Sequence, residues 1–103
     1  MINKKQVQVD EPVCTKCFNT LGVSSRMKIY RFLRSSGEHT VNTVVDLVKL
    51  TQPTVSYHLK EMKDCGILKS RKSGKEVYYS VDPDCKVYMD ECVLYKVEFP
   101  GNY

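Results

Sequence analysis

Apolar residues in the first half of the chain recur at intervals of three and four residues, the period of an amphipathic helix. Three helices are predicted before residue 51, over about residues 11–21, 24–36 and 42–50. Pro12 suits a first helical turn, and Gly22 follows the last apolar residue of the first helix. Ser24 or Ser25 is expected to cap the second helix, because a serine hydroxyl accepts hydrogen bonds from backbone N–H groups there. A short extended piece is expected at residues 39–41.

A fourth helix is predicted from Thr51, whose hydroxyl suits the cap position, to Cys65. Pro53 falls in its first turn, where a missing N–H costs little. The apolar positions follow one another at helical spacing and form one buried stripe, made by Val55, Leu59, Met62 and Cys65. The opposite face carries polar, aromatic and basic side chains: Gln52, Thr54, Ser56, Tyr57, Lys60 and Lys63. His58, beside the stripe, is expected to be a hydrogen-bonded structural residue rather than a ligand.

Two short strands joined by a basic turn are predicted between Gly66 and Val81, because apolar and polar residues alternate toward the end of this stretch. Gly74 allows a tight turn, and four donor side chains crowd around it: Arg71, Lys72, Ser73 and Lys75. Asp82–Pro83 should end the second strand. A helix-turn-helix followed by a basic hairpin is a winged helix, which makes a DNA-binding regulator the leading hypothesis.

The pattern from Asp84 to about Phe99 is again typical of a helix, and it is apolar over more of its surface than a small monomer should expose. Packing against the first helix and against a second copy of the chain would explain this. The predicted organisation is a flexible N-terminal arm (residues 1–10), one domain (residues 11–99) and a short tail (residues 100–103). The fold class is therefore mainly α with a small β-hairpin wing and about five helices, dimerising through the terminal helices.

Positive charge is concentrated in the middle of the chain. Residues 24–76 contain eleven basic and five acidic residues, whereas residues 77–103 contain two lysines and five acidic residues. A local excess of this kind attracts a polyanion such as nucleic acid, although many stable domains carry a similar solvated surface. No apolar run approaches the roughly 18 residues of a membrane-spanning helix, and the N-terminus lacks an apolar signal segment. A cytoplasmic location with no membrane partner is expected.

The exposed face of the fourth helix has the side chains that duplex DNA requires. Gln52 can pair with adenine, Thr54 and Ser56 can bond bases or phosphates, and Tyr57 and Lys60 suit phosphates. The cations of the hairpin suit phosphates or the minor groove: Arg71, Lys72 and Lys75. The alternatives are an ordinary polar surface helix and a solubilising hairpin.

Five cysteines in a chain without a secretory signal argue against a disulfide scaffold. Cys14 and Cys17 lie on one face of the first predicted helix, close enough for one metal ion or one disulfide. Cys85 and Cys92 are two helical turns apart in the last predicted helix. If these helices pack together, four thiols could converge on a thiophilic metal ion such as zinc, or form a redox switch. The alternative is that they are packing positions, as is expected of Cys65.

An enzyme is not indicated by these residues. The strand that precedes a thioredoxin-like Cys-x-x-Cys motif is missing, and no second Cys-x-x-Cys exists to build a zinc ribbon.

Three motifs in order resemble those of the arsenic-repressor (ArsR/SmtB) family of winged-helix regulators. They are residues 21–29 (LGVSSRMKI), 51–59 (TQPTVSYHL) and 66–79 (GILKSRKSGKEVYY). The resemblance extends from about Phe18 to Pro83. It implies a homodimeric repressor that binds a double-stranded DNA operator and is released by an inducer. By position, Gln52, Thr54, Ser56 and Tyr57 would read the operator, and the wing cations Arg71, Lys72 and Lys75 would flank it.

The chain departs from the family's metal sensors in one respect. Those members carry a Cys-x-Cys box in the third helix, but residues 40–47 of this chain contain no cysteine. The arsenic, cadmium or lead site of that type is therefore absent. Other relatives sense through thiols on the terminal helices, where Cys14, Cys17, Cys85 and Cys92 lie. The identity of the inducer does not follow from the sequence. Two alternatives stay open: a constitutive repressor without a ligand site, and a winged helix that binds only proteins.

Overall fold

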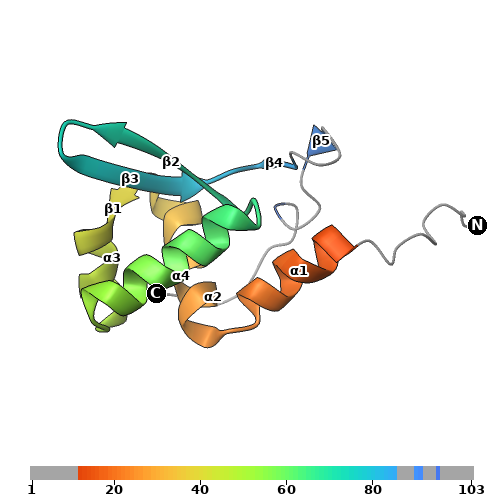
Figure 1. Ribbon diagram of the computed structural model, residues 1–103, viewed down its shortest axis with the longest axis horizontal. Helices are drawn as coiled ribbons and strands as arrows, with labels where there is room; N and C mark the ends of the chain where they lie inside the picture. Colours follow the sequence, from red (N-terminus) through yellow and green to blue (C-terminus); the bar gives the residue numbers. More distant parts are fainter. Residues whose placement is uncertain (1–11, 86–89, 92–94, 96–103) are drawn as a thin grey trace, which may run out of the picture.

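Four helices and a small antiparallel sheet make up most of the part of the chain that the structure describes. The structure is a computed structural model, and it describes residues 12–85, 90–91 and 95 (Figure 1). The helices are α1 (Pro12–Leu21), α2 (Ser24–Ser36), α3 (Val41–Val48) and α4 (Gln52–Asp64). The strands are β1 (His39–Thr40), β2 (Leu68–Ser73), β3 (Glu76–Val81), β4 (Asp84–Cys85) and β5 (Asp90–Glu91).

The β2–β3 hairpin forms the wing, as predicted. Strand β3 lies in the centre of the sheet, with β2 on one side and β1 on the other, and both pairings are antiparallel. The register pairs Leu68 with Val81 at the base of the hairpin and Ser73 with Glu76 at its tip. Gly74 turns the chain there with a φ of 63°, a conformation that glycine adopts without steric cost. In Figure 1 the wing lies along one side of the helical cluster.

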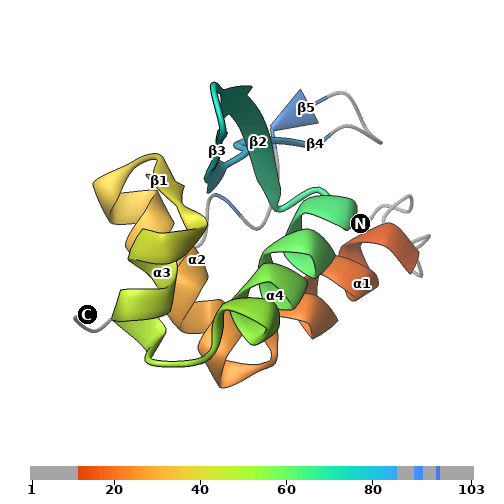
Figure 2. The ribbon, with the colours of Figure 1, turned by 60° about the vertical axis from the view of Figure 1, so that its left-hand side comes forward.

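A single apolar core joins the helices to the base of the wing. Its buried residues are Leu21, Ile29, Tyr30, Leu33, Val44, Val55, Leu59, Met62, Ile67 and Leu68. The predicted stripe of α4 is confirmed for Val55, Leu59 and Met62, each of which is fully buried. Figure 2 shows α4 running between α1 and α3. Because this stripe faces inward, the polar residues between its members must face solvent.

The turn between α3 and α4 is short and has a defined geometry. Only Lys49, Leu50 and Thr51 separate the two helices. Lys49 adopts the left-handed conformation with a φ of 58°, and its N–H bonds to the carbonyl of Val45. The Thr51 side chain then accepts a hydrogen bond from the N–H of Thr54 at 3.4 Å and caps α4, as predicted. This is a helix-turn-helix.

Two of the predicted helix starts need correction. The N-cap of α2 is Val23, whose side chain cannot accept a hydrogen bond, and neither Ser24 nor Ser25 takes that role. Helix α3 begins at Val41, earlier than Asn42 or Thr43, because the Thr40 hydroxyl caps it. The predicted extended piece is correspondingly shorter and comprises His39 and Thr40.

The helix predicted from Asp84 to about Phe99 is wrong at its start. Asp84–Cys85 and Asp90–Glu91 are antiparallel strands that pair with each other. Cys85 therefore does not lie on the face of a helix with Cys92, which lies outside the described residues. Tyr95 is helical, and its ring centroid lies 4.4 Å from the guanidinium carbon of Arg34 on α2.

The buried stripe of α4 gives a stability prediction. Leu59→Ala removes a fully buried side chain from the centre of the core, and it is expected to lower the free energy of unfolding by about 2–5 kcal/mol. Urea denaturation followed by circular dichroism measures the change. Lys63→Ala, at an exposed position of the same helix, should leave the unfolding midpoint nearly unchanged. Equal losses in the two variants would contradict this account of the core.

Candidate nucleic-acid interface

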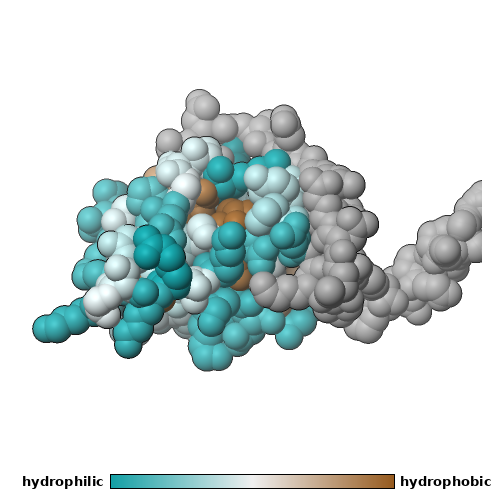
Figure 3. All heavy atoms as spheres, turned by 90° about the horizontal axis from the view of Figure 1, so that it is seen from above, coloured by the Kyte–Doolittle hydropathy of each residue, from teal (hydrophilic) through white to brown (hydrophobic). Residues whose placement is uncertain are grey.

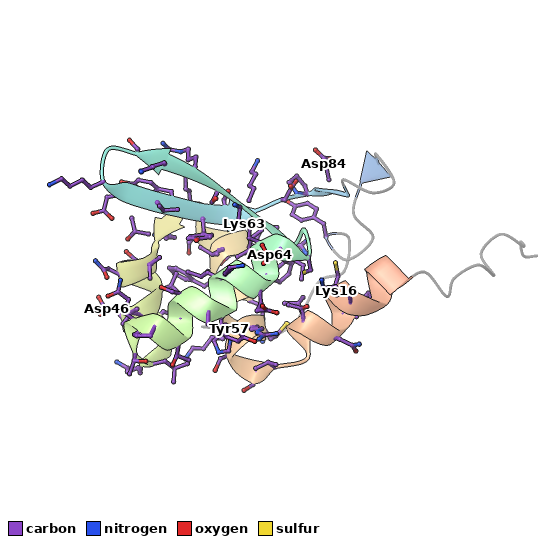
Figure 4. All side chains as sticks on the ribbon, viewed as in Figure 1. Lys16, Asp46, Tyr57, Lys63, Asp64 and Asp84 are labelled. Atoms are coloured by element: carbon purple, nitrogen blue, oxygen red, sulfur yellow. The ribbon has the colours of Figure 1, made fainter. Side chains whose placement is uncertain are left out.

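The polar face of α4 is open to solvent along its length. Gln52, Thr54, Tyr57 and Lys60 are exposed, and Ser56 is half-buried. The side chain of Tyr57 is 55% exposed, which is unusual for a large aromatic residue, and Figure 4 shows it on α4. The Thr51 hydroxyl donates to the Thr54 hydroxyl at 3.0 Å. The first turn of α4 therefore presents the exposed amide of Gln52 and a Thr54 hydroxyl held by Thr51.

Farther along α4, Lys60 is held by an acidic neighbour. Its Nζ lies 2.8 Å from Oδ2 of Asp64 one turn later, and both side chains are at least half exposed. This hydrogen bond is the main reason that the pKa of Lys60 is raised and that of Asp64 lowered. An exposed pair of this kind contributes little to stability. It keeps the ammonium group next to the helix rather than extended into solvent.

Arg71, predicted to be a wing cation, has a partner within the protein. Its Nε and Nη2 donate to the two carboxylate oxygens of Glu38 at 2.7 and 2.9 Å. Its guanidinium carbon also lies 4.8 Å from the ring centroid of Tyr78, its cross-strand neighbour on β3. The hydrogen bond from Arg71 is the main reason that the pKa of Glu38 is lowered. Glu38 thus ties the wing to the segment before β1.

Two lysines are exposed near the tip of the wing. Lys72 lies on β2, and Lys75 belongs to the turn between the strands. Figure 3, which looks at the molecule from the side of the wing, shows hydrophilic residues over the end of the hairpin. Arg71, Lys72 and Lys75 thus project from one hairpin next to α4, although Arg71 differs from the lysines in being paired.

Arg26 makes a set of contacts that the sequence did not reveal. Its Nε donates to Nδ1 of His58 on α4 at 3.0 Å, and its guanidinium carbon lies 5.7 Å from the ring centroid of Tyr57. Its Nη1 also lies 3.5 Å from the carbonyl oxygen of Thr20 at the end of α1. His58 is a hydrogen-bonded structural residue, as predicted. Arg26, which lies on α2, thus contacts both α1 and α4.

The cysteines are only partly brought together. Cys17 is half-buried on α1 and donates a hydrogen bond to the carbonyl of Cys65, which was expected to be a packing residue. The side chains of Cys14, Cys85 and Cys92 lie outside the described residues. Within the described part of the chain, no three His, Cys, Asp or Glu side chains cluster in a way that could hold a metal ion. None of the helices described there is long and apolar enough to span a membrane.

The fold and the exposed helix define a class of protein, namely the winged helix-turn-helix regulators. Residues 24–70 match the family model described as bacterial regulatory protein, arsR family. The chain is 35% identical over 97 residues to a cadmium resistance transcriptional regulatory protein CadC homolog of Staphylococcus aureus, covering 92% of this chain and 80% of that protein.

Two solved structures have the same fold. The transcriptional repressor PagR of Bacillus anthracis is 29% identical, with a TM-score of 0.65 over 73% of this chain and 85% of that one. A homodimeric winged helix-turn-helix DNA-binding domain from Mycobacterium bovis is 22% identical, with a TM-score of 0.64 over 79% of this chain and 72% of that one. The chain belongs to the ArsR family and is a transcriptional regulator.

The surroundings of His58 predict a pH dependence of stability. Partial burial and, second, the charge of Arg26 lower the pKa of His58 in the folded protein. The unfolded chain therefore binds the proton more readily, and stability should fall as the pH drops below about 6.5, the ordinary histidine value. His58→Gln keeps an acceptor but cannot titrate, so it should lose less stability than the wild type between pH 7.5 and pH 5.5.

Urea unfolding midpoints at the two pH values measure this difference. The carboxylates with lowered pKa values, Glu38 and Asp64, act at lower pH and are present in both proteins. Cys65, whose pKa is lowered to about 6, titrates in the same range in both proteins, so only the difference between their falls reports on His58. Equal falls in the midpoints of the wild type and His58→Gln would show that His58 does not set the dependence.

Proposed function

We propose that the chain forms a homodimeric repressor that binds a double-stranded DNA operator through α4 and the wing. The observation that carries the proposal is the exposed polar face at the start of α4, held by a three-residue turn next to a cationic hairpin. Residues near the N-terminus of such a helix reach base edges when the helix enters the major groove. Gln52, Thr54, Ser56 and Tyr57 are the proposed reading residues, and Lys60 is a proposed phosphate contact.

The wing cations are proposed to bind phosphates beside the groove. Lys72 and Lys75 are exposed and suit this role directly, whereas Arg71 must exchange Glu38 for a phosphate. Phosphate binding releases counterions, so operator affinity should fall steeply with salt. A winged helix that binds only proteins would not show this dependence.

Replacement of the two wing lysines tests the proposal. Lys72→Ala/Lys75→Ala should weaken operator binding and reduce the slope of log affinity against log salt by about 0.9 for each phosphate that the wing no longer neutralises. Gel-shift titrations on the DNA upstream of its own gene, at several salt concentrations, measure the slope. Lys28→Ala, which removes an exposed cation on α2, is the matched control and should leave the slope unchanged. A slope that does not change in the wing variant would contradict the proposed role of these lysines.

Dimerisation is proposed to use α1. Two large apolar residues in this region are exposed in the single chain: Phe18 on α1 is 47% exposed, and Val23 in the following turn is 40% exposed. Exposed apolar side chains of this size are typical of an interaction surface. A dimer would also place two copies of α4 against two half-sites of an operator.

A charge placed on α1 tests the dimer. Phe18→Lys should weaken self-association by about tenfold or more, since a buried aromatic anchor contributes more than about 1.4 kcal/mol to many interfaces. Sedimentation equilibrium measures the association. Tyr57→Lys introduces the same charge at a similarly exposed aromatic residue on α4 and should leave self-association intact. A comparable loss in both variants, or in neither, would exclude α1 as the interface.

The inducer is proposed to be a thiophilic metal ion or an oxidant acting on cysteine thiols. One relative is named for cadmium resistance. Helix α3 of this chain contains no cysteine, so a Cys-x-Cys site in that helix is not proposed. The proposed thiols stay those of Cys14, Cys17, Cys85 and Cys92. A constitutive repressor would bind its operator equally well with and without metal or oxidant.

A further inference from the structure

The structure brings together two cysteines that are 48 residues apart in sequence. The Sγ atom of Cys17, on α1, donates to the backbone carbonyl of Cys65 at 3.1 Å. Cys65 is the C-cap residue of α4, and when it is protonated its own Sγ donates to the carbonyl of Met62 at 3.4 Å. Both residues are thiols, and both are half-buried rather than sealed in the core. The contact therefore joins α1 to the C-terminal end of the proposed recognition helix.

The surroundings of Cys65 favour its thiolate. A hydrogen bond from the Cys17 thiol is the largest cause that lowers the pKa of Cys65 to about 6. Burial opposes this effect, and the N–H of Ile67, the hydroxyl of Thr20 and the charge of Lys16 add to it. Lys16 lies on α1, and its charge also lowers the pKa of Asp64 at the end of α4. Both residues are labelled in Figure 4. At neutral pH a thiolate is thus available on Cys65, next to Cys17.

This arrangement has the two parts that disulfide formation requires. A thiolate is the nucleophilic form of cysteine, and redox-sensitive cysteines combine a low pKa with a nearby resolving cysteine. Rotation about the Cβ–Sγ bond lets the single S–H of Cys17 bond either to the Cys65 carbonyl or to the Cys65 sulfur. Ordinary packing of two small apolar side chains would not require the cationic and N–H groups that face Cys65.

We propose that Cys65 and Cys17 form a reversible disulfide when the protein meets a hydroperoxide. The Cys65 thiolate attacks one peroxide oxygen, the O–O bond breaks, and the leaving oxygen takes a proton to become water or an alcohol. Cys65 is then a sulfenic acid. The Cys17 sulfur attacks it, the S–O bond breaks, and the hydroxyl group leaves as water with the proton of Cys17. The two thiols are oxidised by two electrons in total, and one hydroperoxide is reduced.

The consequence for DNA rests on the proposed function. A disulfide fastens α1 to the end of α4, and α1 is the proposed dimer helix. The bond therefore changes how the two copies of α4 are held relative to each other. Operator affinity should fall on the order of tenfold, within the usual range of coupling between two sites.

Peptide mapping tests the site itself. The reduced full-length protein is treated with hydrogen peroxide, its remaining thiols are alkylated, and its digest is analysed by mass spectrometry. A Cys17–Cys65 linked peptide that dithiothreitol removes is expected. Cys14→Ser, the matched control on the same helix, should retain this peptide. Links confined to Cys14, Cys85 or Cys92, or a Cys65 thiol that stays fully alkylatable after peroxide, would overturn the proposal.

Gel shifts of the reduced and oxidised wild-type protein, with Cys65→Ser as the control, test the consequence. A fall in affinity that dithiothreitol restores, and that Cys65→Ser does not show, supports the coupling. A complete disulfide with unchanged affinity overturns the coupling. If the reduced protein binds no DNA but forms the Cys17–Cys65 link, the proposed function fails and the oxidation site stands.

Discussion

The burial of one side of α4 is the constraint on which the rest of the structure depends. Val55, Leu59 and Met62 are fully excluded from solvent, so the rotation of the helix about its axis is fixed by the free energy of the core. The residues between them must then face outward, whatever their chemistry. The same packing that makes the domain stable therefore aims the amide, hydroxyl and aromatic side chains of α4 away from the protein. The polar side chains of α4 are thus placed on the surface by the burial of the apolar side chains on its opposite face.

Polar contacts then hold α4 at its beginning, its middle and its end. Thr51 caps the first turn, and Arg26 donates a hydrogen bond to His58 in the middle. Cys17 donates to the carbonyl of Cys65, the C-cap residue. The second and third contacts come from α2 and α1 and not from α4 itself. The direct polar contact between α1 and the end of α4 is that of Cys17 with Cys65. It offers a physical route by which the proposed dimer helix could influence the proposed recognition helix.

Much of the fold could be predicted because its signals are local. The period of the apolar residues, the cap at Thr51 and the turn at Gly74 each act within a few residues, and the helix-turn-helix and the wing followed from them. The contacts that shape the site join residues 32 to 48 positions apart, and no local pattern encodes such pairings. The start of the stretch after Asp84 was misjudged because Asp84–Cys85 pairs with Asp90–Glu91, and the spacing of apolar residues does not reveal a pairing between such short polar strands. The roles proposed for individual DNA contacts stay predictions.

The pairing of Arg71 with Glu38 affects which anions the wing can bind. Arg71 already has a bidentate carboxylate partner. When it binds another anion, it therefore contributes only the difference in interaction free energy between the new partner and Glu38. A distant or badly oriented phosphate interacts too weakly to replace Glu38. An unpaired lysine, in contrast, is attracted to any anion nearby. The wing thus carries two lysines that are attracted to any nearby anion and one arginine that binds a new anion only by leaving Glu38. The strength of the Arg71–Glu38 pair determines how well placed that anion must be.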